Sequence, residues 1–167
     1  MKTTILFTIL LLSSFTYTQE LPDFQVLNVK GNKVTKDSFL SSGKIIVLNF
    51  WASWCKPCQE EMREISRIKS QDEFKNVQFI SVTIDAQDGV ENAKKIFKNN
   101  KYPWKLYIDT KQDLFNKVLA VTENTGTAIP ISIVINEKGL IMGYHIGFDL
   151  ETYKEDLIND IKLIENK

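Results

Sequence analysis

The sequence predicts an α/β domain in which helices cover one layered sheet. Its 167 residues are 43% apolar and 25% charged, which is enough for one compact core and hardly for two. Strand-like apolar stretches alternate along the chain with stretches of helical periodicity, and one strand-like stretch, residues 44–51, is apolar at nearly every position. This order of elements is typical of an α/β layered sheet.

The first half of the chain begins with a short strand over residues 23–29 and a turn at 30–33 that leads back toward Val34. Residues 44–51, KIIVLNFW, predict a strand that is buried on both faces. Beyond residue 60, apolar residues recur at helical spacing while charged residues fill the other positions; the apolar ones are Met62, Ile65 and Ile68. A strand therefore runs directly into a helix.

The second half repeats this alternation. Residues 77–85 predict a second buried strand, and the next helix has an apolar face of Val90, Ala93 and Phe97. Residues 106–109 predict a strand that leads into a short helix with apolar positions between 114 and 119, and residues 131–146 predict two strands joined at 137–139. A final amphipathic helix is marked by Leu150, Tyr153, Leu157, Ile161 and Ile164.

Residues 1–18 have the layout of an export signal peptide, with Lys2 before an apolar run and small or polar residues after it. The run is too short to cross a bilayer, which needs roughly 20 apolar residues. We therefore expect cleavage near Thr18, a mature domain of residues 19–167 and a periplasmic location. Because Thr16 and Thr18 stand where alanine-like residues are usual, an uncleaved membrane anchor is the alternative.

The charge pattern gives no sign of a nucleic-acid partner. Removal of residues 1–18 takes away Lys2 and no acidic residue, which leaves 20 of the 21 basic groups and all 21 acidic groups. The mature domain would then have a net charge of about −1, too little to attract a polyanion such as nucleic acid. The sequence also contains no Gly-rich phosphate loop. We expect no nucleic-acid partner and no cofactor.

The only two cysteines lie in WASWCKPCQE, residues 51–60, where the strand meets the helix. Pro57 suits a first helical turn, so Cys55 should begin the helix and Cys58 should lie one step inside it. Unpaired N–H groups and the helix dipole favour an anion there, and such thiolates commonly have a pKa lowered from about 8.5 to between roughly 3.5 and 7.5. Lys56 adds a positive charge. Cys55 is the predicted nucleophile and Cys58 the resolving thiol, at a spacing that permits a disulfide.

Other uses of this cysteine pair fit less well. A permanent staple across four residues would contribute only roughly 2 kcal/mol, against about 4.7 for a loop of 100 residues. Zinc needs further ligands, whereas the one histidine, His145, lies in a predicted strand as an ordinary, partly exposed residue. Haem attachment needs a histidine after Cys58, where Gln59 stands. We therefore expect no metal.

The stretch VLNFWASWCKPCQEEM, residues 47–62, resembles the signature of exported thiol-disulfide oxidoreductases of the TlpA and ResA type, which have the thioredoxin-like fold. A second stretch, TAIPISIVI at residues 127–135, is similar to the cis-proline segment of this family. The resemblance covers most of residues 20–165. It implies a central mixed β-sheet flanked by helices on both faces, with an N-terminal β extension and with Pro130 beside the cysteines.

The resemblance also implies the chemistry. Cys55 and Cys58 would form a redox-active disulfide that exchanges with disulfide-containing or dithiol proteins. The backbone before the cis-proline would pair with an extended substrate segment, and Trp54 would offer apolar contact surface or simply pack. The expected substrate-binding residues are Trp54, Lys56, Pro57, Ile129 and Pro130.

One departure from the thioredoxin pattern concerns the proton of Cys58. Thioredoxins have a buried aspartate where this chain has Asn49, which cannot exchange a proton. ResA-like proteins place a glutamate three residues after the second cysteine, and Glu61 occupies that position, close enough along a helix to lie beside Cys58. We expect Glu61 to act as the acid and base; the alternative is an exposed helix acid like Glu60.

Three further departures concern the surface that meets the partner. Arg63 stands where the family usually has a helix proline, Ile131 and Ser132 follow Pro130 where threonines are common, and the stretch TENTGT from Thr122 to Thr127 is longer or more polar than typical. We expect these positions to line the partner groove. They leave the identity of the partner open.

The resemblance favours a monomeric reductant that serves cytochrome c maturation or disulfide reduction and receives electrons from a membrane thiol carrier. The direction of electron flow depends on the reduction potential, which Lys56 and Pro57 do not fix. A disulfide oxidant or isomerase of the same fold is therefore the alternative. Peroxide reduction by Cys55 and a non-enzymatic redox-sensing binding module are two further hypotheses.

Overall fold

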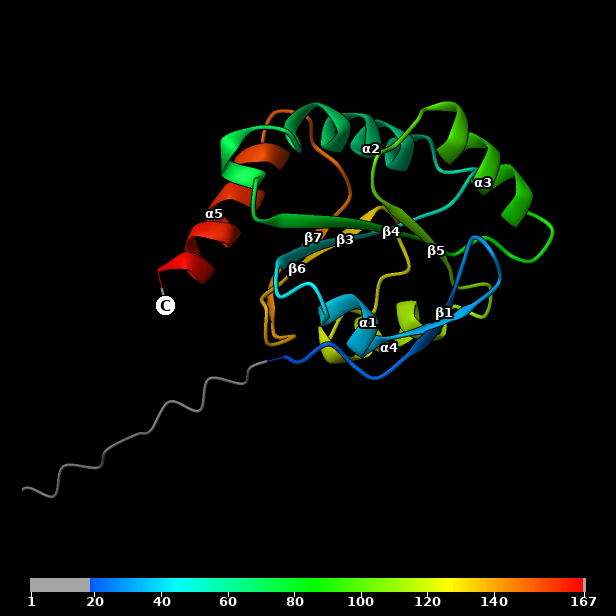
Figure 1. Ribbon diagram of the computed structural model, residues 1–167. Coiled ribbons are helices and arrows are strands. Elements are labelled where there is room, and N and C mark those ends of the chain that lie inside the picture. Colours follow the sequence, from blue (N-terminus) through cyan, green and yellow to red (C-terminus); the bar gives the residue numbers. More distant parts are fainter. Residues whose placement is uncertain (1–18, 167) are drawn as a thin grey trace, which may run out of the picture.

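The computed structural model describes residues 19–166, which form one sheet with helices on both faces (Figure 1). The seven strands lie in the order β2-β1-β5-β4-β3-β6-β7. Strands β3, β4 and β5 are parallel, whereas β1, β6 and β7 pair antiparallel with their neighbours. The strands are β1 Gln25–Asn28, β2 Lys33–Thr35, β3 Ile45–Trp51, β4 Val77–Thr83, β5 Lys105–Ile108, β6 Ile131–Ile135 and β7 Ile141–Ile146.

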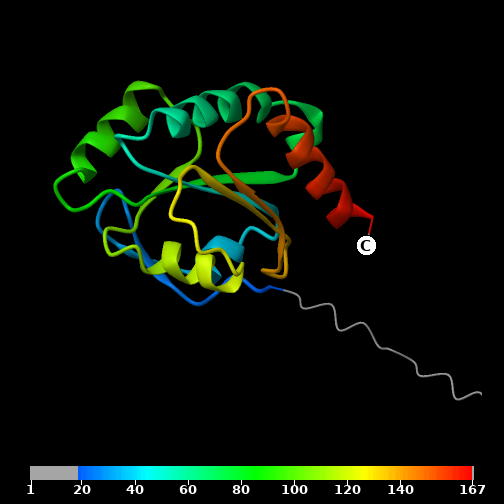
Figure 2. The same ribbon diagram turned by 180° about the vertical axis from the view of Figure 1, so that it is seen from behind.

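The helices divide between the two faces of the sheet (Figures 1 and 2). Helices α2 (Lys56–Ile68), α3 (Val90–Asn99) and α5 (Tyr153–Glu165) cover one face, and α1 (Lys36–Leu40) and α4 (Asp113–Val121) cover the other. The predicted mixed sheet, with helices on both faces and an N-terminal β extension, is confirmed.

Strand β3 is the centre of the core, and all of its residues are buried. Ile46 and Leu48 belong to the apolar cluster that includes α1 and α4. Ile45 and Val47 belong to a cluster with α2 and α5. Each such side chain contributes about 2 kcal/mol through burial. Since side chains alternate along a strand, Asn49 continues the series that faces α2.

The structure differs from the sequence prediction in three places. Helix α1 and a 3-10 turn at Asp72–Phe74 were not predicted, because each is too short to show a period. Helix α5 begins at Tyr153, and Leu150, which was predicted to lie on its apolar face, is an exposed residue before it. Leu150 was assigned to the helix because its spacing to Tyr153 imitates a helical step.

The predicted signal peptide, residues 1–18, lies outside the described residues. Within residues 19–166, every helix is too short or too polar to cross a membrane.

Candidate active site

The two cysteines form a disulfide where β3 passes into α2. A turn, closed by the Cys55 N–H that donates to the Ala52 carbonyl at 3.0 Å, connects the strand to the helix. Cys55 is the residue that caps α2, and the Cys58 N–H donates to Cys55 Sγ at 3.2 Å. One of the free amides of the helix start therefore points at the sulfur, as the sequence predicts.

The predicted proline segment lies against this sulfur. The Ile129–Pro130 peptide bond is cis, and the Ile129 carbonyl oxygen lies 3.7 Å from Cys55 Sγ. The Gly147 N–H donates to the Pro130 carbonyl at 2.8 Å, which fixes the loop after β7 beside the proline. Pro130 is buried and Ile129 is partly exposed.

The remaining predicted substrate-binding residues surround the cysteines at the surface. Lys56 and Pro57 are exposed in the first turn of α2, and Trp54 is 70% exposed. Cys58, by contrast, is fully buried, and Cys55 nearly so. Trp54 therefore exposes a large apolar ring next to the disulfide; its contact with a substrate stays a prediction.

Glu61 lies inside the protein and is 0% exposed. It follows Cys58 by three positions on the buried face of α2. The Ser132 hydroxyl donates to Glu61 Oε1 at 2.7 Å, and the Asn49 amide donates to Oε2 at 3.3 Å. Glu61 is therefore not an exposed helix acid like Glu60, which was the alternative expectation.

Burial raises the pKa of Glu61 from 4.5 to about 7, because desolvation disfavours the carboxylate. Hydrogen bonds from Ser132, Tyr153 and Asn49 act in the opposite direction but do not offset the desolvation. A carboxyl group with this pKa gains and loses its proton near neutral pH. Such a group is suited to accept a proton from a neighbouring thiol.

The partners of Glu61 belong to a polar row that runs across the sheet. Ser81 on β4, Asn49 on β3, Ser132 on β6 and His145 on β7 are register neighbours in sequence from one strand to the next. The Ser81 hydroxyl donates to Asn49 Oδ1 at 2.5 Å, which orients the Asn49 amide toward Glu61. Each of these four strands therefore supplies one polar side chain at the same level of the sheet.

The outer end of this polar row is a hydrogen-bonded His–Asp pair, which becomes an ion pair when His145 is protonated. His145 Nε2 lies 2.7 Å from Asp160 Oδ2 of α5, and both side chains are mostly buried. The hydrogen bond to Asp160 raises the pKa of His145, and the positive charge of His145 lowers that of Glu61. A Cβ atom at Gly143 would overlap the Asp160 carboxylate, so only glycine leaves room for this pair. His145 is thus more constrained than the ordinary, partly exposed residue that the sequence predicts.

Asp85 holds the turn in front of the cysteines. It is buried just after β4, and its carboxylate accepts the Ser53 N–H at 2.8 Å and the Ser53 hydroxyl at 2.7 Å. The Gln59 amide donates to the Ser53 carbonyl at 2.9 Å. The backbone N–H and the carbonyl of Ser53 are therefore both held by hydrogen bonds. Sequence reasoning missed this residue, although an acid at the carboxyl end of a buried parallel strand was the available signal.

Comparison with known proteins identifies the family. Residues 17–143 match the AhpC/TSA family. The chain belongs to the AhpC/TSA family. A thiol-disulfide oxidoreductase ResA of Bacillus thuringiensis is 32% identical over 149 residues, which cover 87% of this chain and 77% of the relative. The sporulation thiol-disulfide oxidoreductase A of Bacillus subtilis is 26% identical over 125 residues, 74% of this chain and 70% of the relative.

A solved structure of a thioredoxin-like protein from Porphyromonas gingivalis has the same fold, with a TM-score of 0.72 at 23% identity over 89% of this chain and 94% of that one. The predicted resemblance to ResA-type proteins and the thioredoxin-like fold are confirmed. With its redox-active cysteine pair, this AhpC/TSA family member is a thiol-disulfide oxidoreductase.

Some of the residues that differ from the family pattern do not lie at the partner groove, where they were predicted to lie. Ile131 and Ser132 are buried, so neither lines a partner groove. Ser132 was assigned to the groove because a single sequence does not show how the strand after Pro130 aligns with its neighbours. Arg63 lies on the solvent side of α2, where it pairs loosely with Glu60 at 3.9 Å.

The stretch 122–127 connects α4 to β6 and is anchored by Asn124, whose amide donates to the Tyr144 hydroxyl at 2.8 Å. Its contact with a partner stays a prediction. Among residues 19–166, no group of three or more His, Cys, Asp or Glu side chains is arranged to hold a metal ion.

Proposed function

We propose that this oxidoreductase reduces disulfides in exported proteins, with Cys55 as the nucleophile, Cys58 as the resolving thiol and Glu61 as the acid and base. The observation that carries the proposal is the placement of Cys55 Sγ. It lies 3.2 Å from a helix-start amide and 3.7 Å from the Ile129 carbonyl. One neighbour stabilises negative charge on the sulfur, and the other marks where a substrate backbone can align.

In the first step the Cys55 thiolate attacks one sulfur of the partner disulfide. A bond forms between Cys55 and that sulfur, the partner S–S bond breaks, and the second partner sulfur leaves as a thiolate. The Cys58 N–H supports Cys55 as a thiolate before the attack. An extended partner segment pairs with the backbone before Pro130, and its apolar side chains contact Trp54.

In the second step Cys58 gives its proton to the Glu61 carboxylate and attacks Cys55 Sγ. The mixed disulfide breaks, the partner leaves as a thiolate, and the Cys55–Cys58 disulfide forms. Two electrons have passed from the cysteine pair to the partner. When an external dithiol reduces the pair for the next cycle, Glu61 returns the proton to the Cys58 thiolate.

The loop after β7 extends the contact surface for a partner. Its backbone is tied to Pro130 through Gly147. Two exposed apolar residues, Ile146 and Leu150, precede and follow Gly147 in the sequence. Trp54 is exposed as well, and exposed apolar side chains of this kind suit an unfolded or flexible segment of a protein.

We further propose a periplasmic location after removal of residues 1–18, a monomeric state and a membrane thiol carrier as the electron donor. The signal-like layout of residues 1–18 supports the location, and the similarity to thiol-disulfide oxidoreductases supports a thiol as the electron donor. Cytochrome c maturation and general reduction of wrongly paired cysteines are two uses of the same chemistry. They differ only in the partner that docks at the surface around Trp54.

An insulin-reduction assay tests the reaction. The wild-type protein should precipitate insulin in the presence of dithiothreitol, and Cys55→Ser should be inactive. Peroxide consumption measured in parallel should be absent. Peroxidase activity without insulin reduction would support the peroxide hypothesis instead, and inactivity in both assays would support the binding module.

The reduction potential tests the direction of electron flow. Equilibration in defined thiol buffers should give a value near that of thioredoxin, about −270 mV, whereas a value near −120 mV would make the protein an oxidant. The role of Glu61 is tested separately by Glu61→Gln. This variant should slow partner release and change the pH profile of exchange, and an unchanged profile would remove Glu61 from the mechanism.

A further inference from the structure

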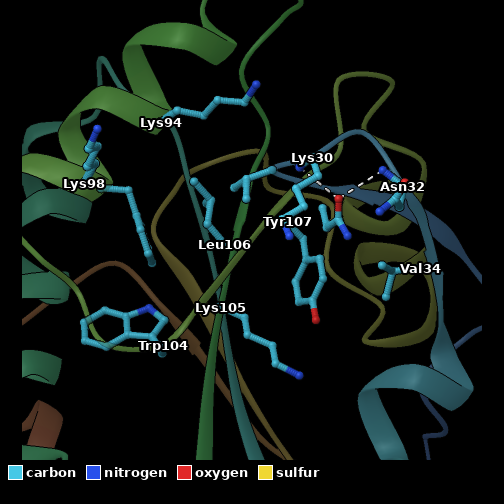
Figure 3. A pocket seen from close by; sticks show the side chains of 12 residues that line it. Lys30, Asn32, Val34, Lys94, Lys98, Trp104, Lys105, Leu106 and Tyr107 are labelled. Atoms are coloured by element: carbon cyan, nitrogen blue, oxygen red, sulfur yellow. Dashed lines mark hydrogen bonds between the residues drawn. The ribbon is translucent and has the colours of Figure 1, made fainter.

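A hollow lies away from the cysteines, between α3, β5 and the β1–β2 hairpin (Figure 3). Its volume is about 700 Å³, within the range of roughly 300–1,000 Å³ that small-molecule sites occupy. It shares no lining residue with the redox site among the residues that the structure describes. The reaction proposed above makes no use of it.

The hollow exists because the β1–β2 hairpin pairs with only the last part of β5. Strand β1 pairs with β5 only at Tyr107 and Ile108. The next residues of the hairpin turn away, so Lys105 and Leu106 have β4 on one side and the hollow on the other. Asn28 Oδ1 accepts the backbone N–H groups of Lys30 and Asn32 at 2.9 and 3.0 Å, which holds the turn open in a fixed shape (Figure 3).

The wall of the hollow is apolar and preformed. Phe97 of α3 and Trp104 pack edge to face with ring centroids 5.9 Å apart. The Trp104 indole N–H donates to the Ser81 hydroxyl at 2.7 Å, so its polar atom is satisfied inside the protein and the ring is held in place. Leu106 continues this wall, whereas Val34 and Tyr107 line the hollow from the opposite face of the sheet. A bound apolar chain would meet surface that needs no rearrangement.

The rim of the hollow is positively charged. Lys94 and Lys98 come from α3, Lys30 comes from the hairpin turn and Lys105 comes from β5 (Figure 3). No acidic residue is among the described residues that line it. Lys94 pairs with the exposed Glu91 at 2.7 Å, whereas Lys30, Lys98 and Lys105 form no ion pair within residues 19–166. The chain as a whole has 21 basic and 21 acidic groups, so this excess is local.

We propose that the hollow binds a small amphipathic anion, with an unbranched apolar chain and one carboxylate. The chain lies against Trp104 and Leu106, and the carboxylate lies among the lysines of the rim. A cation of equal length would have its charge among like charges. An acidic polypeptide would leave most of the apolar wall without contact, and the volume of about 700 Å³ fits a single small ligand better.

Titration of the oxidised protein with decanoate, followed by ¹H–¹⁵N NMR, tests the proposal. Saturable shifts are expected at the amides of Leu106 and Tyr107 and none at Cys58. Decyltrimethylammonium, which has the same chain length and the opposite charge, should bind at least about tenfold more weakly. Equal binding of the two, or no saturable shift up to ~1 mM decanoate, would overturn the proposal, as would binding of a poly-glutamate peptide at these amides without binding of decanoate.

Charge reversal on the rim provides matched variants. The double variant Lys98→Glu with Lys105→Glu should weaken decanoate binding about tenfold, since each exposed ion pair contributes up to about 1 kcal/mol. Lys95→Glu, on the same helix but outside the rim, should change it less than about twofold. Equal losses in both variants would show a general charge effect and contradict the assignment. Insulin reduction should be unaffected by either variant, which separates failure here from failure of the redox function.

Discussion

The buried carboxyl of Glu61 gives the oxidised protein a pH-dependent stability. Because its pKa in the folded protein is about 7 against 4.5 for an exposed carboxyl, the folded state holds the proton more tightly than the unfolded state. The resulting stabilisation is fully present below pH 4.5 and is lost as the pH rises through 7. A difference of about 2.5 units at 1.36 kcal/mol per unit corresponds to about 3 kcal/mol.

Urea denaturation of wild type and Glu61→Gln, with the disulfide intact, measures this effect. The amide cannot titrate, so the free energy of unfolding of wild type relative to the variant should fall by about 3 kcal/mol between pH 4 and pH 8. Glu60→Gln, which changes the exposed neighbouring acid, should show no such trend. A difference between wild type and Glu61→Gln that stays constant over this range would refute the argument that burial controls this carboxyl group.

Changes at Cys58, Asp85 and His145 test three other parts of the site. Cys58→Ser should accumulate a mixed disulfide between Cys55 and a disulfide-containing partner on non-reducing gels; rapid release would mean that another thiol resolves the intermediate. Asp85→Asn should lower the free energy of unfolding by about 2 kcal/mol, because the hydrogen bonds from Ser53 lose a charged acceptor, and unchanged urea midpoints would argue against this anchor. His145→Gln should raise the titration midpoint of Glu61, followed by carboxyl ¹³C NMR, because a nearby positive charge is lost; a constant midpoint would contradict that coupling.

The regular elements could be predicted because their signals are local. The run at residues 44–51 and the helical spacing after it became β3 and α2, and the proline after Cys55 located the start of the helix. The resemblance to a known family supplied the expectation that Pro130 lies beside the cysteines, and the structure places it there.

The polar interior of the site could not be predicted. Ser81, Asn49 and Ser132 meet only because the register aligns three strands that are far apart in the sequence. The same is true of Asp85 and Ser53, which are 32 positions apart. A single sequence carries no signal for strand register across a sheet, and so Ser132 was assigned to the surface rather than to Glu61.

Alkylation of reduced Cys58→Ser protein by iodoacetamide as a function of pH tests the central claim most directly. If the amides at the start of α2 stabilise the Cys55 thiolate, half-maximal reactivity should occur well below pH 8.5, the midpoint for an ordinary cysteine. A midpoint at or above 8.5 would mean that the helix start does not activate Cys55, and the proposed exchange mechanism would be wrong.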